Sequence, residues 1–143
     1  MIIANRRFSI NSPLERIEQL VMKAVIEALQ PERLEASDEK SFQAMVKAKM
    51  GPLNLPMHMA GEIISPSNPL EFMIKLKGQG GLIWLNQKAT FTLTSLDKDK
   101  TEVACELVAV GMAPLLRIFL LWKVKSFAAD ILGGFENQLR QWA

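Results

Sequence analysis

The spacing of hydrophobic residues changes along the chain and divides it into elements. Met1 to Ile10 alternates as a strand, and from position 14 to position 29 apolar residues recur every three or four positions. That spacing is the period of an amphipathic helix. From Glu32 to Val110 the period falls to two, which is typical of half-buried strands, and the helical period returns from Pro114 onward. The pattern predicts a strand, a helical segment, a run of strands and a long closing helix.

The helical segment after the first strand carries a start signal. Ser12 is expected as its N-cap, Pro13 as its first helical residue and Glu15 as the partner that completes a capping box. Pro31 ends the segment, because proline removes a helical hydrogen bond. This stretch is either one helix or two short ones with a bend.

Short connections join the expected strands, so the sheet is expected to be antiparallel. Met50-Gly51-Pro52 predicts a bulge or bend, since proline cannot donate to a central ladder. The glycine-rich stretch 78–81 and the polar stretch 97–100 predict turns. The strands are expected over residues 1–10, 32–38, 42–50, 55–64, 70–77, 82–96 and 101–110.

The closing segment, Pro114 to Ala143, predicts one long helix with proline at its first position. Gly133 and Gly134 interrupt it. They indicate either close packing or a local bend, or else a hinge that lets the helix lift from a pocket. The apolar stripe of this helix comprises Leu121, Val124, Ala128, Ile131, Phe135, Leu139 and Trp142.

A second apolar row occupies the start of the same helix. Leu115, Phe119 and Trp122 lie roughly opposite the main stripe at 100° per residue. Either a loop covers this row, or it is an exposed patch for a membrane surface or a protein partner. Lys123 and Lys125 beside it would suit anionic lipid headgroups.

A curled antiparallel sheet cannot be filled by one helix alone, so the pattern predicts an apolar cavity between the two. The eight methionines of the chain would suit such a lining, because methionine is flexible and unbranched. We expect a single α+β domain over residues 1–143. The residues expected to line its cavity are Met45, Met57, Met59, Phe72, Ile74, Trp84, Phe91, Leu121, Ala128 and Phe135.

Composition excludes several classes of function. A net charge of +2 is too small to indicate nucleic-acid binding. Cys105 is the only cysteine, so an internal disulfide cannot form and a reducing, cytoplasmic location is expected. Arg6 and Arg7 precede no long apolar run, so no secretory signal is expected. The richest apolar window, Met112 to Trp122, is too short to span a bilayer and contains Arg117.

No catalytic constellation emerges from the sequence. His58 is the only histidine, so no metal site is expected, and it is interpreted as a structural or surface residue. Cys105, in an apolar strand, is interpreted as a small core residue. Asn86, Gln87 and Lys88 lie in the middle of a strand. Either one of them points inward and orients a polar group of a ligand, or they form a solvated outer face.

The chain resembles the START-like (SRPBCC, helix-grip) superfamily and, within it, the carbon monoxide dehydrogenase G-subunit family. The resemblance implies a curved antiparallel sheet of about seven strands wrapped around a long C-terminal helix, with one or two short helices after the first strand. It covers nearly the whole chain and is carried by Leu29-Gln30-Pro31-Glu32 leading to Asp38, Phe42-Gln43-Ala44-Met45-Val46, Met50-Gly51-Pro52 followed by Gly61, Lys77-Gly78-Gln79-Gly80-Gly81, the strand from Ala89 to Leu93, Thr101-Glu102-Val103 and the final helix.

The resemblance also implies a function. Members of this family accompany molybdenum- or copper-containing dehydrogenases and are thought to help membrane association or to carry a quinone-like or lipid-like molecule. The wider superfamily includes cyclases and ligand carriers.

The function expected from the sequence is therefore non-enzymatic binding or carriage of an apolar small molecule, without a cofactor. The alternative is an accessory factor without cargo that docks to a membrane surface or to a dehydrogenase partner, and a cyclase- or hydrolase-type enzyme is a third interpretation. The expected location is cytoplasmic or peripheral to the inner face of the membrane. The sequence leaves the oligomeric state open.

Overall fold

The order of elements follows the hydrophobic periods of the sequence. The computed structural model describes residues 1–38, 40–50, 53–64 and 71–143. The elements are β1 (Ile2–Ile10), α1 (Leu14–Ala28), β2 (Arg33–Ser37), β3 (Ser41–Met50), β4 (Leu53–Ile64), β5 (Glu71–Gly80), β6 (Ile83–Asp97), β7 (Lys100–Met112), α2 (Pro114–Phe119) and α3 (Leu121–Trp142).

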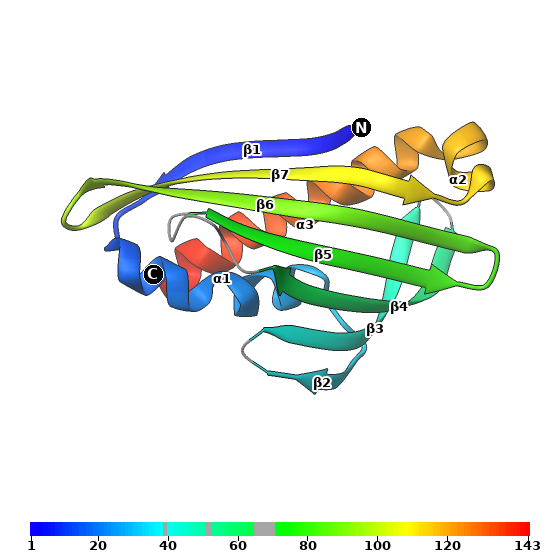
Figure 1. Ribbon diagram of the computed structural model, residues 1–143, viewed down its shortest axis with the longest axis horizontal. Coiled ribbons are helices and arrows are strands. Elements are labelled where there is room, and N and C mark those ends of the chain that lie inside the picture. The colour runs from blue at the N-terminus through cyan, green and yellow to red at the C-terminus, as the bar shows by residue number, and fades with distance from the viewer. Residues whose placement is uncertain (39, 51–52, 65–70) are drawn as a thin grey trace.

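The described strands form one seven-stranded sheet in the order β1-β7-β6-β5-β4-β3-β2. Every neighbouring pair is antiparallel. Figure 1 shows the sheet curving over α3, which runs from α2 toward the end of the molecule where α1 lies. The expected α+β fold, with a curved antiparallel sheet around a long C-terminal helix, is confirmed.

The predicted stripe of α3 is the part of the helix that packs in the core. Val124, Ala128, Ile131, Phe135 and Leu139 are buried, as expected from their spacing. The Phe135 ring lies 4.7 Å from the ring centre of Phe91 on β6 and 6.3 Å from that of Phe8 on β1. These aromatic contacts join the helix to two strands that are distant in sequence.

An ion-pair network supports the same attachment from outside the core. Glu136 of α3 accepts hydrogen bonds from Nε of Arg6 at 2.6 Å and from Nε of Arg140 at 2.7 Å. Arg6 belongs to β1, so this carboxylate links the helix to the edge of the sheet.

The predicted capping box of the first helix is wrong. Pro13, with φ −67° and ψ 153°, is the N-cap, and α1 begins at Leu14 with no side-chain cap bond. Ser12 is buried instead, and its carbonyl accepts a 2.8 Å hydrogen bond from the Thr101 hydroxyl of β7. This contact ties the backbone of Ser12, which lies between β1 and α1, to β7. The segment forms one helix and not two. It ends at Ala28 with Leu29 as its C-cap, and Gln30 follows in the left-handed region with φ 50°.

The closing segment is two helices rather than one. Leu120, with φ −125° and ψ 16°, leaves the helical region and separates α2 from α3. Periodicity does not reveal such a break, because the apolar spacing continues across it. At Gly133 and Gly134, where the sequence indicated either close packing or a bend or hinge, α3 continues without interruption. A β-carbon on Gly134 would lie 3.5 Å from Ala28, so this face packs closely on α1.

One predicted turn differs in detail, and one predicted interruption cannot be compared. β5 continues to Gly80, and the turn is made by Gly81, whose φ is +64°, with Leu82. The predicted interruption at Met50-Gly51-Pro52 includes residues 51 and 52, which lie outside the described residues.

We predict that Phe135→Ala lowers the free energy of unfolding by about 3–5 kcal/mol, because a buried aromatic ring is removed from between two others. Phe119→Ala is the matched control, since it makes the same change at a side chain that is 67% exposed. It should change stability by less than about 0.5 kcal/mol. Urea denaturation followed by circular dichroism measures both, and equal losses would contradict the assigned packing.

We further predict that Gly133→Ala and Gly134→Ala each stabilise the fold by about 1 kcal/mol, which is the difference in helix propensity. The added methyl groups would meet their nearest atoms at 3.6 Å and 3.5 Å, which is ordinary contact. Gly61→Ala provides the opposite control, because its methyl group would overlap the Phe42 ring. Thermal denaturation measures the three variants, and destabilisation by the helical substitutions would refute the packing at this helix crossing.

Candidate functional site

The concave side of the sheet gathers most of the residues that the sequence predicts for ligand binding. Their side chains point toward the helices, because alternate residues of each strand face the same side. Leu121 lies half-buried at the start of α3. The remaining inward residues, all buried, are Met57 and Met59 on β4, Ile74 on β5, Phe91 on β6, and Ala128 and Phe135 on α3.

Two of the predicted lining residues lie on the wrong side of the sheet. Met45 alternates with the buried Ala44 and Val46, so its side chain faces the outer surface. Trp84 precedes the buried Leu85 and is likewise outward and 36% exposed. The predictions that Met45 and Trp84 line the interior are therefore wrong, because successive side chains of a strand point to opposite faces of the sheet. The backbone of Phe72 pairs with Phe91, but the Phe72 side chain lies outside the described residues.

The methionines on β4 meet beneath a glycine of β5. A β-carbon placed on Gly78 would lie 2.7 Å from Cε of Met57 and 2.7 Å from Sδ of Met59. The ends of these two side chains therefore occupy the space that a larger residue would take. Methionine has three rotatable side-chain bonds and repacks easily, so this part of the interior is filled by groups that can move without moving the backbone.

Gln87 is a polar residue of the concave wall that the described part of the structure leaves unpaired. It lies on β6 between the buried Leu85 and Ala89, and its own side chain is 2% exposed. Neither its amide oxygen nor its amide nitrogen has a hydrogen-bond partner among the described residues. Asn86 and Lys88 take the opposite face of the strand. Gln87 is therefore the residue of this triplet that points inward.

Titratable groups do not converge on this interior among the described residues. Burial raises the pKa of the Cys105 thiol to about 12, an effect that the nearby Arg6 only partly offsets. The thiol contacts the carbonyl of Arg6 at 3.5 Å and stays protonated near neutral pH. His58 lies on the outer face with Nε2 3.5 Å from a carboxylate oxygen of Glu35. Within the described chain, no group of three or more potential metal ligands occurs.

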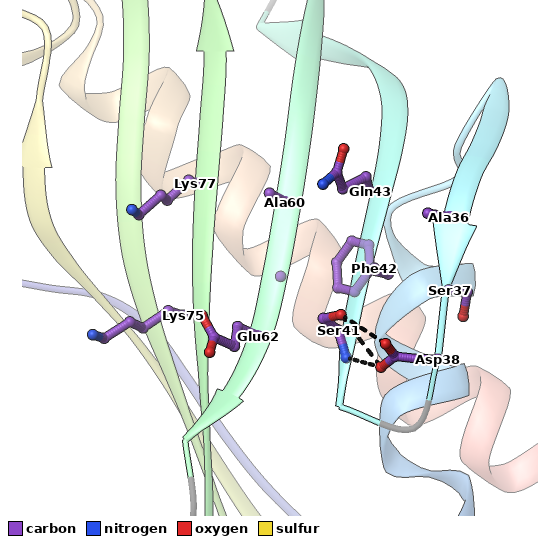
Figure 2. Close-up of a pocket in the computed structure, with 11 residues that line it drawn as sticks. Ala36, Ser37, Asp38, Ser41, Phe42, Gln43, Ala60, Glu62, Lys75 and Lys77 are labelled. Atoms are coloured by element: carbon purple, nitrogen blue, oxygen red, sulfur yellow. Dashed lines mark hydrogen bonds between the residues drawn. The ribbon is translucent and has the colours of Figure 1, made fainter.

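A hollow of about 370 Å³ opens over strands β2 to β5. Figure 2 shows Asp38 at its rim, turned toward Ser41, with Lys75 and Lys77 on the far strand. The Asp38 carboxylate accepts hydrogen bonds from the backbone N–H groups of Lys40 and Ser41 at 2.7 and 2.8 Å. These bonds hold its pKa below the usual value. They also close the turn between two strands, so the role of Asp38 is structural.

Two larger hollows flank α1. One of about 580 Å³ lies between the end of α1, α3 and β3, and includes Phe127, Ile131 and Gly134. The other, of about 600 Å³, lies between α1 and the sheet edge, and includes Met22, Leu34 and Ile63. Both open at the surface. None of these three hollows is lined by Met57, Met59 or Gln87, so none of them is the predicted cavity between the concave sheet and the closing helix. Next to Gly78 that interior is filled by the methionine side chains.

An exposed apolar surface covers α2 and the first turn of α3. We call it the end patch and define it by Leu115, Ile118, Phe119 and Trp122, whose exposed fractions are 44%, 66%, 67% and 64%. The predicted second row is therefore exposed rather than covered by a loop. Ile118 lies three residues after Leu115 and four before Trp122, so it fits the same helical spacing, but the predicted row did not include it.

Positive charge accompanies the end patch. Nζ of Lys123 lies 3.7 Å from the centre of the Trp122 ring, which is a cation–π contact. Arg117 and Lys125 are exposed on the same segment, and the sequence has no acidic residue from Leu107 to Ala129. No described helix is long and apolar enough to cross a bilayer.

Comparisons with solved structures identify the architecture. No protein-family model and no curated protein matches the chain. A conserved protein from Geobacillus kaustophilus superposes with a TM-score of 0.78 at 14% identity, over 96% of this chain and 91% of that chain. A START superfamily protein from Mycobacterium smegmatis superposes with a TM-score of 0.61 at 14% identity, over 96% and 94%.

An enzyme has the same fold. Norcoclaurine synthase from Thalictrum flavum, in complex with dopamine and hydroxybenzaldehyde, superposes with a TM-score of 0.59 at 12% identity, over 96% of this chain and 86% of that chain. The architecture is therefore compatible with both binding and catalysis. Its element order, curved sheet and structural neighbours show that the chain has the START-like, or helix-grip, fold.

Proposed function

We propose that this protein binds and carries an apolar small molecule between the concave face of the sheet and α3. The observation that carries the proposal is the Met57–Met59 pair over Gly78, where flexible ends fill space next to the backbone. A ligand entering here would displace side-chain ends rather than strands. The cost of admitting it is therefore lower than at a wall of branched or aromatic residues.

The chemistry of the interior favours binding over catalysis. General acid–base or nucleophilic catalysis needs groups whose pKa values lie near the working pH. The Cys105 thiol, with its pKa raised to about 12, is poorly suited to act as a nucleophile. A lipid-like or quinone-like molecule, which the family resemblance implies, would match an apolar wall.

A second proposal concerns docking, and the end patch supports it. Exposed aromatic and aliphatic side chains next to Arg117, Lys123 and Lys125 suit an anionic lipid surface, because apolar burial and attraction to headgroups act together. Peripheral attachment at a membrane would bring an insoluble ligand to its carrier. The role as accessory to a membrane-associated dehydrogenase is likewise part of this proposal and is supported by the family resemblance.

We predict that the neutral fluorescent probe N-phenyl-1-naphthylamine brightens on binding the protein, because it enters the apolar interior. Met57→Leu together with Met59→Leu should weaken binding, since leucine conserves volume but has fewer rotatable bonds. Met73→Leu, on the outer face of β5, is the matched control and should leave probe binding unchanged. Fluorescence titration measures the affinities.

The end patch could also bind this probe, so a variant with Phe119→Ser and Trp122→Ser must be titrated in parallel. It should retain the probe. No brightening with the wild-type protein, or loss of brightening only in the Phe119 and Trp122 variant, would contradict interior binding.

We predict that the protein floats with vesicles of equal parts phosphatidylcholine and phosphatidylserine, and that Phe119→Ser with Trp122→Ser abolishes flotation while the fold is retained. The control is Leu34→Ser with Leu96→Ser, which removes two exposed apolar side chains elsewhere. Added salt should weaken flotation, because it screens the basic side chains. Unchanged flotation of the end-patch variant would refute docking through this surface.

A further inference from the structure

The unpaired amide of Gln87 needs a partner that the described protein atoms do not supply. The side chain is 2% exposed, and neither Oε1 nor Nε2 makes a hydrogen bond with them. Buried polar groups in folded proteins are nearly always paired, because an unpaired one keeps the full cost of leaving water. A glutamine amide can both donate and accept, so this group is equipped for a partner with either character.

Its neighbours across the sheet cannot satisfy it. Gln87 pairs in register with Leu76 of β5 and with Ala109 of β7, and both are buried and apolar. The other two buried polar residues in the described part of the chain, Thr101 and Ser12, are already joined by a 2.8 Å hydrogen bond from the Thr101 hydroxyl to the Ser12 carbonyl. Among the described residues, the Gln87 amide therefore has only apolar side chains beside it on the concave wall and no hydrogen-bond partner.

The strand beside Gln87 is irregular at this level. Between Asn86 and Gln87 the register with β7 shifts, and Val110 has no partner on β6. A bulge of this kind re-aims side chains and is frequent next to functional sites. The regular ladder on the other side brings Gly78 opposite Leu85, only two residues from Gln87 on its strand. The displaceable ends of Met57 and Met59 thus lie near the unpaired amide.

We infer that Gln87 is the polar anchor of the interior site and selects a neutral, apolar ligand that carries one carbonyl or hydroxyl group. This inference rests on the interior binding proposed above. A ligand carbonyl would accept from the amide nitrogen, and a ligand hydroxyl would donate to the amide oxygen. A carboxylate is disfavoured, because no lysine, arginine or histidine is buried among the described residues and an unpaired buried anion is costly.

Three related probes test the anchor: 2-acetylnaphthalene, 2-ethylnaphthalene, in which a methylene replaces the carbonyl, and 2-naphthoate. Equilibrium dialysis should show that the wild-type protein binds the ketone about tenfold more tightly than the hydrocarbon, as one net hydrogen bond predicts. The carboxylate should bind most weakly.

Gln87→Leu should remove this preference by weakening the ketone alone. It should also raise the melting temperature, because the unpaired amide is gone. The matched control is Gln79→Leu, at an exposed outward position of β5, which should leave the preference unchanged.

The outcomes separate the anchor from the interior site. If ketone and hydrocarbon bind equally to both wild type and Gln87→Leu, the anchor is refuted while interior binding stands. If neither binds the wild type, interior binding itself fails and the anchor fails with it. If Gln87→Leu lowers the melting temperature and keeps the ketone preference, an ordered water satisfies the amide and the inference is overturned.

Discussion

The burial of one face of α3 against the concave sheet is the contact on which the remaining structure depends. Phe135 lies against Phe91 and Phe8 and so connects the helix with the middle and the edge of the sheet. Each fully buried side chain of this kind contributes about 1.5–3 kcal/mol through removal from water. Without this contact the strands would expose their inner face, and the proposed interior site could not form.

The concave wall differs in character along its length. Around Phe91 the packing is aromatic. Four residues earlier on β6 lies Gln87, near a part of the wall filled by Met57 and Met59. At about 3.3 Å per residue this separates the two regions by roughly 13 Å. The wall therefore combines an aromatic part, which maintains the fold, with an adaptable part, where the proposed ligand would enter.

The adaptable part and the end patch belong to the same end of the molecule. The N–H of Ala113, just before α2, donates to the carbonyl of Trp84 at the start of β6, and Figure 1 shows α2 near the turn between β5 and β6. On the proposals made above, a ligand would enter the site close to the surface that meets the membrane. This arrangement would shorten the path of an insoluble molecule through water.

Periodicity alone determined the order of strands and helices, apart from the break between α2 and α3, and the buried stripe of α3, because spacings of two and of three to four follow from backbone geometry. It also determined that one residue of the triplet 86–88 could point inward. Only the tertiary structure decided which one, and it placed Met45 and Trp84 outside. A strand presents two faces, and when apolar residues occupy both, local pattern cannot say which is covered. The packing of α3, the register of the ladders and the contact that holds Ser12 are long-range, so they exist only in the folded chain.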